Sequence, residues 1–214
     1  MRAWFLLILV ASGGNSRAQT SLPVQKPTAQ LMLILPAQLG NPIFDRLTSP
    51  LGEVDGSVQF PMKNGLGAGV GGKMMWWELK ANAFAPTLST PGEARRSALY
   101  AKVQYAHYVT PNMFYELNAK FGTSTWTWDC TTCEEDYKQQ GFHWGVTAGY
   151  YVHASDNLAF GVTFGYEADA TRFSAATICQ GSFPGFTETG GPYRFLNVGL
   201  GFSTRFEKSK EERW

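Results

Sequence analysis

The stretch GFHWGVTAGYYVHASDNLAFGVTFGYEADA, residues 141–170, decides the fold. Each half alternates apolar or aromatic residues with small or polar ones, and the apolar set is Phe142, Trp144, Val146, Ala148, Tyr150, Val152, Leu158, Phe160, Val162, Phe164 and Tyr166. Side chains of a strand point alternately to opposite faces. Ser155, Asp156 and Asn157 separate the halves and supply turn chemistry. The stretch therefore predicts a β-hairpin with one wide apolar face.

Two environments can cover such a face: a protein core or lipid. A soluble barrel turns its apolar face inward and carries many charges outside, whereas a membrane barrel turns it outward and fills its interior with small or polar groups. The second face of this hairpin carries Gly, Thr, Tyr and His residues and very few charges. We therefore expect the apolar face to contact lipid.

The composition agrees with a membrane barrel. The chain has 214 residues, enough for one domain, and only 16% of them are charged, below the quarter that is usual in soluble domains. The formal net charge is +1, which gives no electrostatic reason to expect a nucleic-acid partner. No apolar run reaches the roughly 18 residues of a spanning helix, so the chain can cross a membrane only as a closed barrel.

The N-terminus predicts export. Arg2 precedes an apolar run from Ala3 to Ala11, and small residues at Ser16 and Ala18 predict signal-peptide cleavage after Ala18. The alternative is a buried N-terminal strand. The absence of a cysteine near the cleavage point argues against a lipoprotein. We expect residues 1–18 to be a signal peptide, 19–28 a periplasmic lead, 29–206 the barrel and 207–214 a charged tail.

The same alternation predicts eight strands: 29–39, 54–62, 66–79, 97–109, 113–128, the two halves of the opening hairpin, and 193–206. The connections after the first, third, fifth and seventh strands are long, and the others contain about three residues. Short periplasmic turns and long outer loops are typical of outer-membrane barrels. The predicted fold is all-β: an eight-stranded antiparallel up-and-down transmembrane β-barrel with both termini in the periplasm.

Aromatic residues of the apolar face occur at two levels, as in the two girdles of a membrane barrel. Tyr115, Tyr150 and Phe160 are expected near the periplasmic ends of their strands. The residues expected near the outer ends are Trp76, Phe142, Trp144 and Tyr166. The general preference of aromatic residues for strands explains their number, but explains this grouping less well.

The last strand, PYRFLNVGLGFSTRF at residues 192–206, carries a family resemblance. Its apolar alternation through Val198, Leu200 and Phe202 to a closing aromatic, Phe206, resembles small outer-membrane β-barrel proteins of the OmpA/OmpX type. The resemblance implies outer-membrane lipids and the barrel-insertion machinery as partners. The chain departs from the family pattern in its tail, EKSKEERW, because the family usually stops at the aromatic.

Five charged residues fall on the inward face: Lys73, Lys102, Glu116, Lys120 and Glu167. Charges inside a narrow barrel must be paired or hydrated, and eight strands enclose a space that side chains fill. We expect an ion-paired polar interior and no catalytic residue, metal or cofactor. A small gated pore and a catalytic carboxylate are the alternatives.

Three histidines bear on an enzymatic alternative. His107 falls on the lipid-facing parity, and His143 and His153 fall at opposite ends of the sixth strand. Some eight-stranded outer-membrane barrels modify lipid A with a histidine and a serine or acidic partner. His143 is the one placed for such a role, with Ser124 and Glu167 facing inward near the same end. The spacing matches no recognised motif.

Cys130 and Cys133 lie in one outer loop and Cys179 in another. Disulfides are permitted at a cell surface, but three cysteines cannot all pair within one chain. A Cys130–Cys133 bridge would stabilise little, and a bridge to Cys179 would join two loops. Zinc bound by all three lacks a fourth ligand.

These patterns predict a non-enzymatic integral outer-membrane barrel with an envelope-structural, adhesive or narrow-permeability role. The alternatives are a lipid A-modifying barrel enzyme and a soluble, secreted, lipocalin-like binder, whose interior would have to be apolar. The sequence does not specify a partner for the outer loops.

Overall fold

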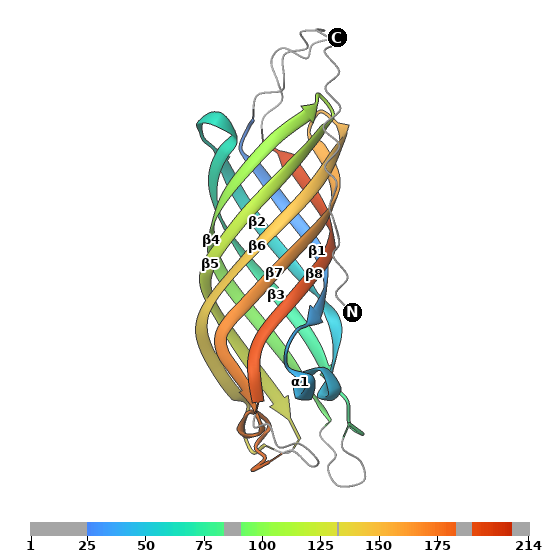
Figure 1. The fold of residues 1–214 in the computed structure, drawn as a ribbon, viewed down its shortest axis with the longest axis vertical. Helices are drawn as coiled ribbons and strands as arrows, with labels where there is room; N and C mark the ends of the chain where they lie inside the picture. Colours follow the sequence, from blue (N-terminus) through green and yellow to red (C-terminus); the bar gives the residue numbers. More distant parts are fainter. Residues whose placement is uncertain (1–24, 84–90, 132, 183–189, 207–214) are drawn as a thin grey trace, which may run out of the picture.

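The structure is a computed structural model that describes residues 25–83, 91–131, 133–182 and 190–206 and forms a closed antiparallel barrel (Figure 1). The strands are β1 Thr28–Gln38, β2 Thr48–Pro61, β3 Leu66–Leu79, β4 Gly92–Thr110, β5 Met113–Cys130, β6 Tyr137–Ser155, β7 Leu158–Ser174 and β8 Gly190–Arg205. Each strand pairs with its neighbours in the sequence, and β1 pairs with β8 to close the barrel. The expected signal peptide and the charged tail lie outside the described residues.

The connections separate by length to the two ends of the barrel. Short connections at residues 63–65, 111–112 and 156–157 gather at one end, here called the short-turn end (top of Figure 1). Asn64 and Gly65 adopt left-handed φ values of 60° and 81° in the first of them, a conformation that Asn and Gly tolerate best. The opposite end, here called the long-loop end, carries the long connections. The up-and-down order predicted from the sequence is confirmed.

Apolar side chains cover the outer wall. On β6, Phe142, Trp144, Val146, Tyr150 and Val152 are all exposed, while the side chains between them point into the barrel. The apolar face of the hairpin therefore points outward, as the sequence predicts. The apolar run in β1 divides in the same way, because Leu31, Leu33 and Leu35 point outward and Met32 and Ile34 point inward.

Several strands extend further toward the long-loop end than the sequence predicts. β2 begins at Thr48 rather than residue 54, and β4 begins at Gly92 rather than residue 97. The backbone ladder continues through these segments, with Thr48 opposite Leu79 and Leu79 opposite Gly92. The outward residues in and beside these segments are largely polar, with the exception of Leu51, and they include Arg95, Ser97, Thr123, Thr125 and Thr127. Beyond the hydrocarbon both faces can be polar, so the alternation that marks a strand is lost.

A short helix, α1 Pro42–Leu47, occupies part of the segment expected to be a loop. Asn41 caps it by accepting a hydrogen bond from the Phe44 backbone N–H (3.0 Å), and Pro42 takes the first helical position, where its missing N–H costs nothing. Ile43, Phe44 and Leu47 are completely buried. The helix therefore directs its apolar side chains into the barrel.

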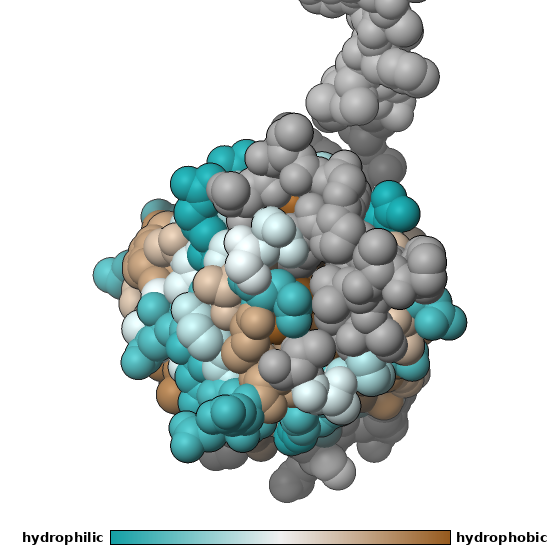
Figure 2. Space-filling model, turned by 90° about the horizontal axis from the view of Figure 1, so that it is seen from below, coloured by the Kyte–Doolittle hydropathy of each residue, from teal (hydrophilic) through white to brown (hydrophobic). Residues whose placement is uncertain are grey.

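Phe44 lies at the centre of a cluster that closes the long-loop end, here called the aromatic plug. Its ring centroid lies 5.0–6.1 Å from those of the other six members, which are Trp77, Trp126, Trp128, Phe173, Tyr193 and Phe195. All six contacts are edge-to-face, a favourable geometry for aromatic rings. Seen from this end, hydrophilic residues are prominent around the rim and apolar residues show on the flank (Figure 2).

Candidate functional site

Between the aromatic plug and the short-turn end the barrel contains a set of charged and polar side chains, here called the interior network. Its members are almost completely buried: Glu53, Asp55, Lys73, Arg96, Tyr100, Lys102, Glu116, Lys120, His143, Glu167 and Asp169. Burying a charge costs free energy unless an opposite charge or hydrogen-bond partners compensate it. The partners of each group therefore decide whether the network is a filler or a site.

The tier next to the plug is centred on Arg96. Its Nη2 donates to Asp169 Oδ1 (2.7 Å) and its Nη1 to Glu167 Oε2 (3.2 Å). His143 Nδ1 lies 3.0 Å from the same Asp169 oxygen, and Trp126 Nε1 donates to Asp169 Oδ2 (2.7 Å). Because Trp126 also belongs to the aromatic plug, the plug and the network form one continuous packed unit.

The middle tier contains direct lysine–carboxylate pairs. Lys73 forms an ion pair with Glu167, and its Nζ lies 3.5 Å from Glu53 Oε1. Lys120 Nζ lies 2.6 Å from Asp55 Oδ2. The partners come from different strands and meet across the interior, so these pairs occupy the space through which a pore would have to run.

Three carboxylates of these tiers, Glu53, Asp55 and Glu167, lie close enough together to suggest a metal site, with one oxygen from each within 4.8 Å of the others. Lys73 and Lys120 already contact them, and Arg96 Nη1 lies 3.6 Å from Glu53 Oε2. The positive charge that these carboxylates need is therefore supplied by side chains.

In the tier nearest the short-turn end, amide hydrogen bonds replace the ion pairs of the other tiers. Glu116 accepts hydrogen bonds from three side-chain amides, at distances of 2.8 Å from Gln30, 3.2 Å from Gln59 and 2.6 Å from Asn118. Lys102 donates to Gln30 Oε1 (2.8 Å) and to the Ser57 hydroxyl (3.0 Å). Within the described ranges Glu116 forms no ion pair, so its charge is solvated by amides alone.

The structure brings only some of the five expected interior residues together. Lys73 contacts Glu167, whereas Lys120 pairs with Asp55, which was not among the five. Lys102 and Glu116 are linked through Gln30 instead of contacting each other.

Besides Tyr100 and His143, four network members were not among the five expected residues, and these are Glu53, Asp55, Arg96 and Asp169. Glu53 and Arg96 lie in segments that were interpreted as loops. Asp55 and Asp169 have the inward parity of Ser57 and Glu167, a signal that could have identified them.

The residues of the enzymatic alternative are enclosed. His143 is 0% exposed and Ser124 is 1% exposed. His143 Nδ1 is held by Asp169 and Arg96, and no hydrogen bond between His143 and Ser124 occurs in the part of the chain that the structure describes. His107 is exposed on the outer wall, and His153 lies at the short-turn end, where it contacts Tyr108. A lipid substrate has no direct access to His143 in this arrangement.

The cysteines divide into a bridge and a thiol. Cys133 and Cys179 form a disulfide that joins residues 46 positions apart, and Cys130 is a buried free cysteine. Cys179 follows the short helix η2 Ala175–Ile178, whose Ile178 packs in the cluster that contains the aromatic plug. The bridge therefore joins two connections of the long-loop end.

Comparisons with known proteins support the fold but no closer relationship. No protein-family model matches the sequence, and no curated protein matches it significantly. The chain is similar in structure to Neisserial surface protein A (NspA), with a TM-score of 0.53, 14% identity, and coverage of 84% of this chain and 97% of that one.

Two further structures have TM-scores of 0.49. They are the outer membrane protein OprG from Pseudomonas aeruginosa (7% identity, 84% and 96% covered) and a major outer membrane protein from Thermus thermophilus (9% identity, 85% and 100% covered).

The fold is thus that of small eight-stranded outer-membrane barrels. None of the helices in the described ranges is long and apolar enough to cross a membrane. The outer wall exposes apolar side chains on every strand, including Leu33, Val70, Leu99 and Leu200. A closed sheet with an apolar exterior and a polar interior satisfies its backbone within a bilayer. The barrel and its apolar wall together place the chain in an outer membrane.

Proposed function

We propose that this protein is a non-enzymatic, non-conducting outer-membrane barrel of the OmpA/OmpX type with a structural role in the envelope. The observation that carries the proposal is the filled interior: ion pairs cross the barrel beneath the aromatic plug. Of the three roles that the sequence leaves open, the filled interior favours an envelope-structural or adhesive role over narrow permeability. The loops of the long-loop end would face the exterior, and the short turns the periplasm.

The packing of the interior supports a closed barrel. A conducting path needs a continuous column of water, and Arg96, Lys73 and Lys120 lie across the space that such a column would fill, each in contact with a carboxylate. Opening the path would separate buried charges from their partners, which costs several kcal/mol for each ion. Eight strands also leave little interior volume beyond that of the side chains.

The same packing supports the absence of catalysis. His143, the one histidine placed for lipid A chemistry, is buried beneath the plug with two charged partners. A general acid or base must come within hydrogen-bond reach of its substrate. The interior residues therefore act together as a rigid filler that holds the barrel shape.

Export and insertion complete the proposal. Residues 1–18 would be removed as a signal peptide, and residues 19–28 would remain as a periplasmic lead. β8 would be recognised by the insertion machinery, although the charged tail from Glu207 to Trp214 departs from the usual pattern. Outer-membrane lipids are the partners that the apolar wall requires.

Single-channel recording tests the proposal. The purified protein, shown to be folded by its altered gel mobility before and after boiling, is inserted into planar lipid bilayers beside a water-filled porin as a positive control. We expect no stepwise conductance when insertion is verified by protease protection. Reproducible unitary currents that scale with salt concentration would contradict a sealed interior and favour the narrow-permeability role.

A further inference from the structure

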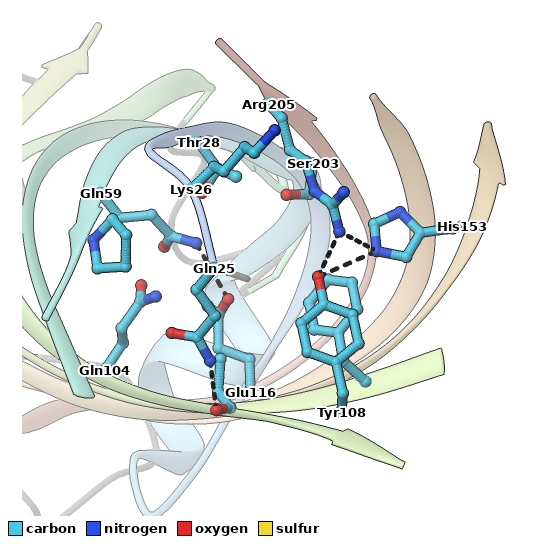
Figure 3. Close-up of a pocket in the computed structure, with 13 residues that line it drawn as sticks. Gln25, Lys26, Thr28, Gln59, Gln104, Tyr108, Glu116, His153, Ser203 and Arg205 are labelled. Carbon is cyan, nitrogen blue, oxygen red and sulfur yellow. Dashed lines mark hydrogen bonds between the residues drawn. The ribbon is translucent and has the colours of Figure 1, made fainter. Parts of the chain in front are cut away.

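The short-turn end contains a pocket that the filled interior does not explain (Figure 3). Its cavity volume is about 30 Å³. The floor carries Glu116, which is completely buried, and Gln59 and Gln104 stand beside it, each 4% exposed. Arg205, with His153 and Tyr108, lies on the other side of the pocket. The two sides have opposite chemistry.

The Glu116 side offers acceptors. The Gln59 amide nitrogen donates to Glu116. This hydrogen bond fixes the orientation of the amide, so that Gln59 Oε1 points away from Glu116. Gln59 Oε1 and Gln104 Oε1 are buried, and neither has a hydrogen-bond partner in the described parts of the chain. Unpaired buried acceptors cost free energy unless a donor or a water satisfies them. Together with the amide-solvated carboxylate, they form a site for a group with several N–H donors and a positive charge.

The Arg205 side offers donors. Its Nη2 contacts the Tyr108 hydroxyl (2.5 Å) and His153 Nε2 (3.0 Å), and its Nη1 donates to the Asp156 carbonyl (3.1 Å). These partners are neutral, and within the described ranges Arg205 forms no ion pair. A guanidinium has five N–H donors, so it retains capacity for an anionic oxygen. The neutral ring stack of Tyr108 and His153 holds the guanidinium at the pocket edge.

We propose that this pocket binds a small zwitterion of the amino-acid type, with its ammonium on Glu116 and the two glutamine oxygens and its carboxylate on Arg205. A simple amine would compensate Glu116 but leave Arg205 unpaired, and a simple carboxylate would do the reverse. A ligand with both charges on one small frame satisfies both sides. The inference goes beyond the structural role and does not depend on a sealed interior.

Size and access restrict the ligand further. With Gln25 in its present position, the inner part of the pocket holds about two water molecules. The Gln25 side chain lies across the pocket and donates to the Ala106 carbonyl (2.6 Å). The ligand must therefore be small at its charged head, and the Gln25 side chain must turn outward to admit it. The head can belong to a free amino acid or project from a larger molecule.

The test is an NMR titration of the ¹⁵N-labelled full-length mature protein in lipid nanodiscs. The probes are glycine, glycinamide, which lacks the carboxylate, and Nα-acetylglycine, which lacks the ammonium. We expect glycine to shift amides of the short-turn end, such as Gln104 and Ser203, and to bind at least about tenfold more tightly than either analogue, since a charge-assisted hydrogen bond contributes about that much. Equal affinities for the three probes, or no shifts with glycine, would overturn the proposal.

Two substitutions assign the halves of the ligand to the two sides. Glu116→Gln should weaken the binding of glycine and of glycinamide at least about tenfold and leave the binding of Nα-acetylglycine unchanged. Arg205→Gln should instead weaken the binding of glycine and of Nα-acetylglycine and leave that of glycinamide unchanged. Glu78→Gln, an exposed carboxylate at the long-loop end, is the matched control and should change nothing. Unchanged selectivity in both variants would refute the assignment. If Glu116→Gln does not fold, as judged by gel mobility, Arg205→Gln with the three probes decides alone.

A fourth probe distinguishes the two sources of the zwitterion. Nε-acetyl-lysine presents the same ammonium and carboxylate on a long side chain. Binding at least as tight as that of glycine supports a head carried by a larger molecule, and binding of glycine alone supports a free small amino acid. Failure of both ligands to shift the short-turn end contradicts the site itself, whatever the conductance measurements show.

Discussion

The two ends of the barrel interior are closed by different means. The long-loop end is filled by the aromatic plug, in which Phe44 contacts six other rings. The short-turn end is lined by glutamines, Glu116 and Arg205, several of whose polar atoms have no partner within the described ranges. In the plug the unpartnered polar atoms are two indole N–H groups, those of Trp77 and Trp128, set among packed rings, whereas the unpartnered glutamine oxygens of the short-turn end line a pocket. The two ends of one interior thus differ in what they offer: packed rings at the long-loop end and a polar pocket at the short-turn end.

The interior network between these ends gives the largest expected effect. Replacing Arg96 with Met leaves Asp169 and Glu167 without a major counter-charge, so the free energy of unfolding should fall by about 3–5 kcal/mol. The measurement is urea unfolding in detergent, followed by tryptophan fluorescence. The adjacent Arg95 is 55% exposed in its side chain and pairs with Glu93, which is also exposed to solvent. Arg95→Met is the control and should cost less than about 1 kcal/mol. Equal losses of unfolding free energy in the two variants would show that the interior network does not stabilise the barrel.

Breaking the plug should cost somewhat less. Phe44→Ala removes the central ring, and we expect the free energy of unfolding to fall by about 3 kcal/mol in the same assay, because a cavity forms among the remaining rings. Phe44→Leu keeps most of the volume and should lose less than about 1.5 kcal/mol. In planar bilayers the Phe44→Ala variant should stay closed, because the ion pairs below remain. Unitary currents in this variant would show that the plug alone is the seal.

The disulfide at the long-loop end gives the smallest of the three expected effects on the free energy of unfolding. Cys133→Ser should lower the free energy of unfolding by about 2 kcal/mol, since the bridge closes a long segment of chain in the unfolded state. Cys130→Ala is the matched control and should lose less than about 1.5 kcal/mol. Reductant should bring the wild type to the level of Cys133→Ser and leave that variant unchanged. Insensitivity of the wild type to reductant would show that the bridge does not stabilise the closed end.

The strands, and the face of each that points outward, could be predicted because contact with lipid imposes a strict alternation of apolar with small or polar residues, as in β6. The long-loop end could not, because strands that leave the hydrocarbon lose that constraint: Arg96 and Glu53 lie in such extensions. The helix α1 was missed although Asn41 and Pro42 form a recognisable helix start. Parity could place Glu116 and Lys102 in the interior, but not show that Gln30 joins them, since cross-barrel contacts depend on how the sheet closes.

The length of the strands places the aromatic plug outside the hydrocarbon. β4 has 19 residues, which at about 3.3 Å per residue and a tilt of about 40° rise about 45 Å, against an apolar band of about 25 Å. Outward Arg95, Thr125 and Thr127 stand on the part of the wall next to Trp126 and Trp128. The hydrogen-bonded sheet therefore extends past the lipid tails at this end of the barrel. The part of the wall that stands clear of the lipid tails is thus paired strand, with its backbone N–H and C=O groups already hydrogen-bonded to each other.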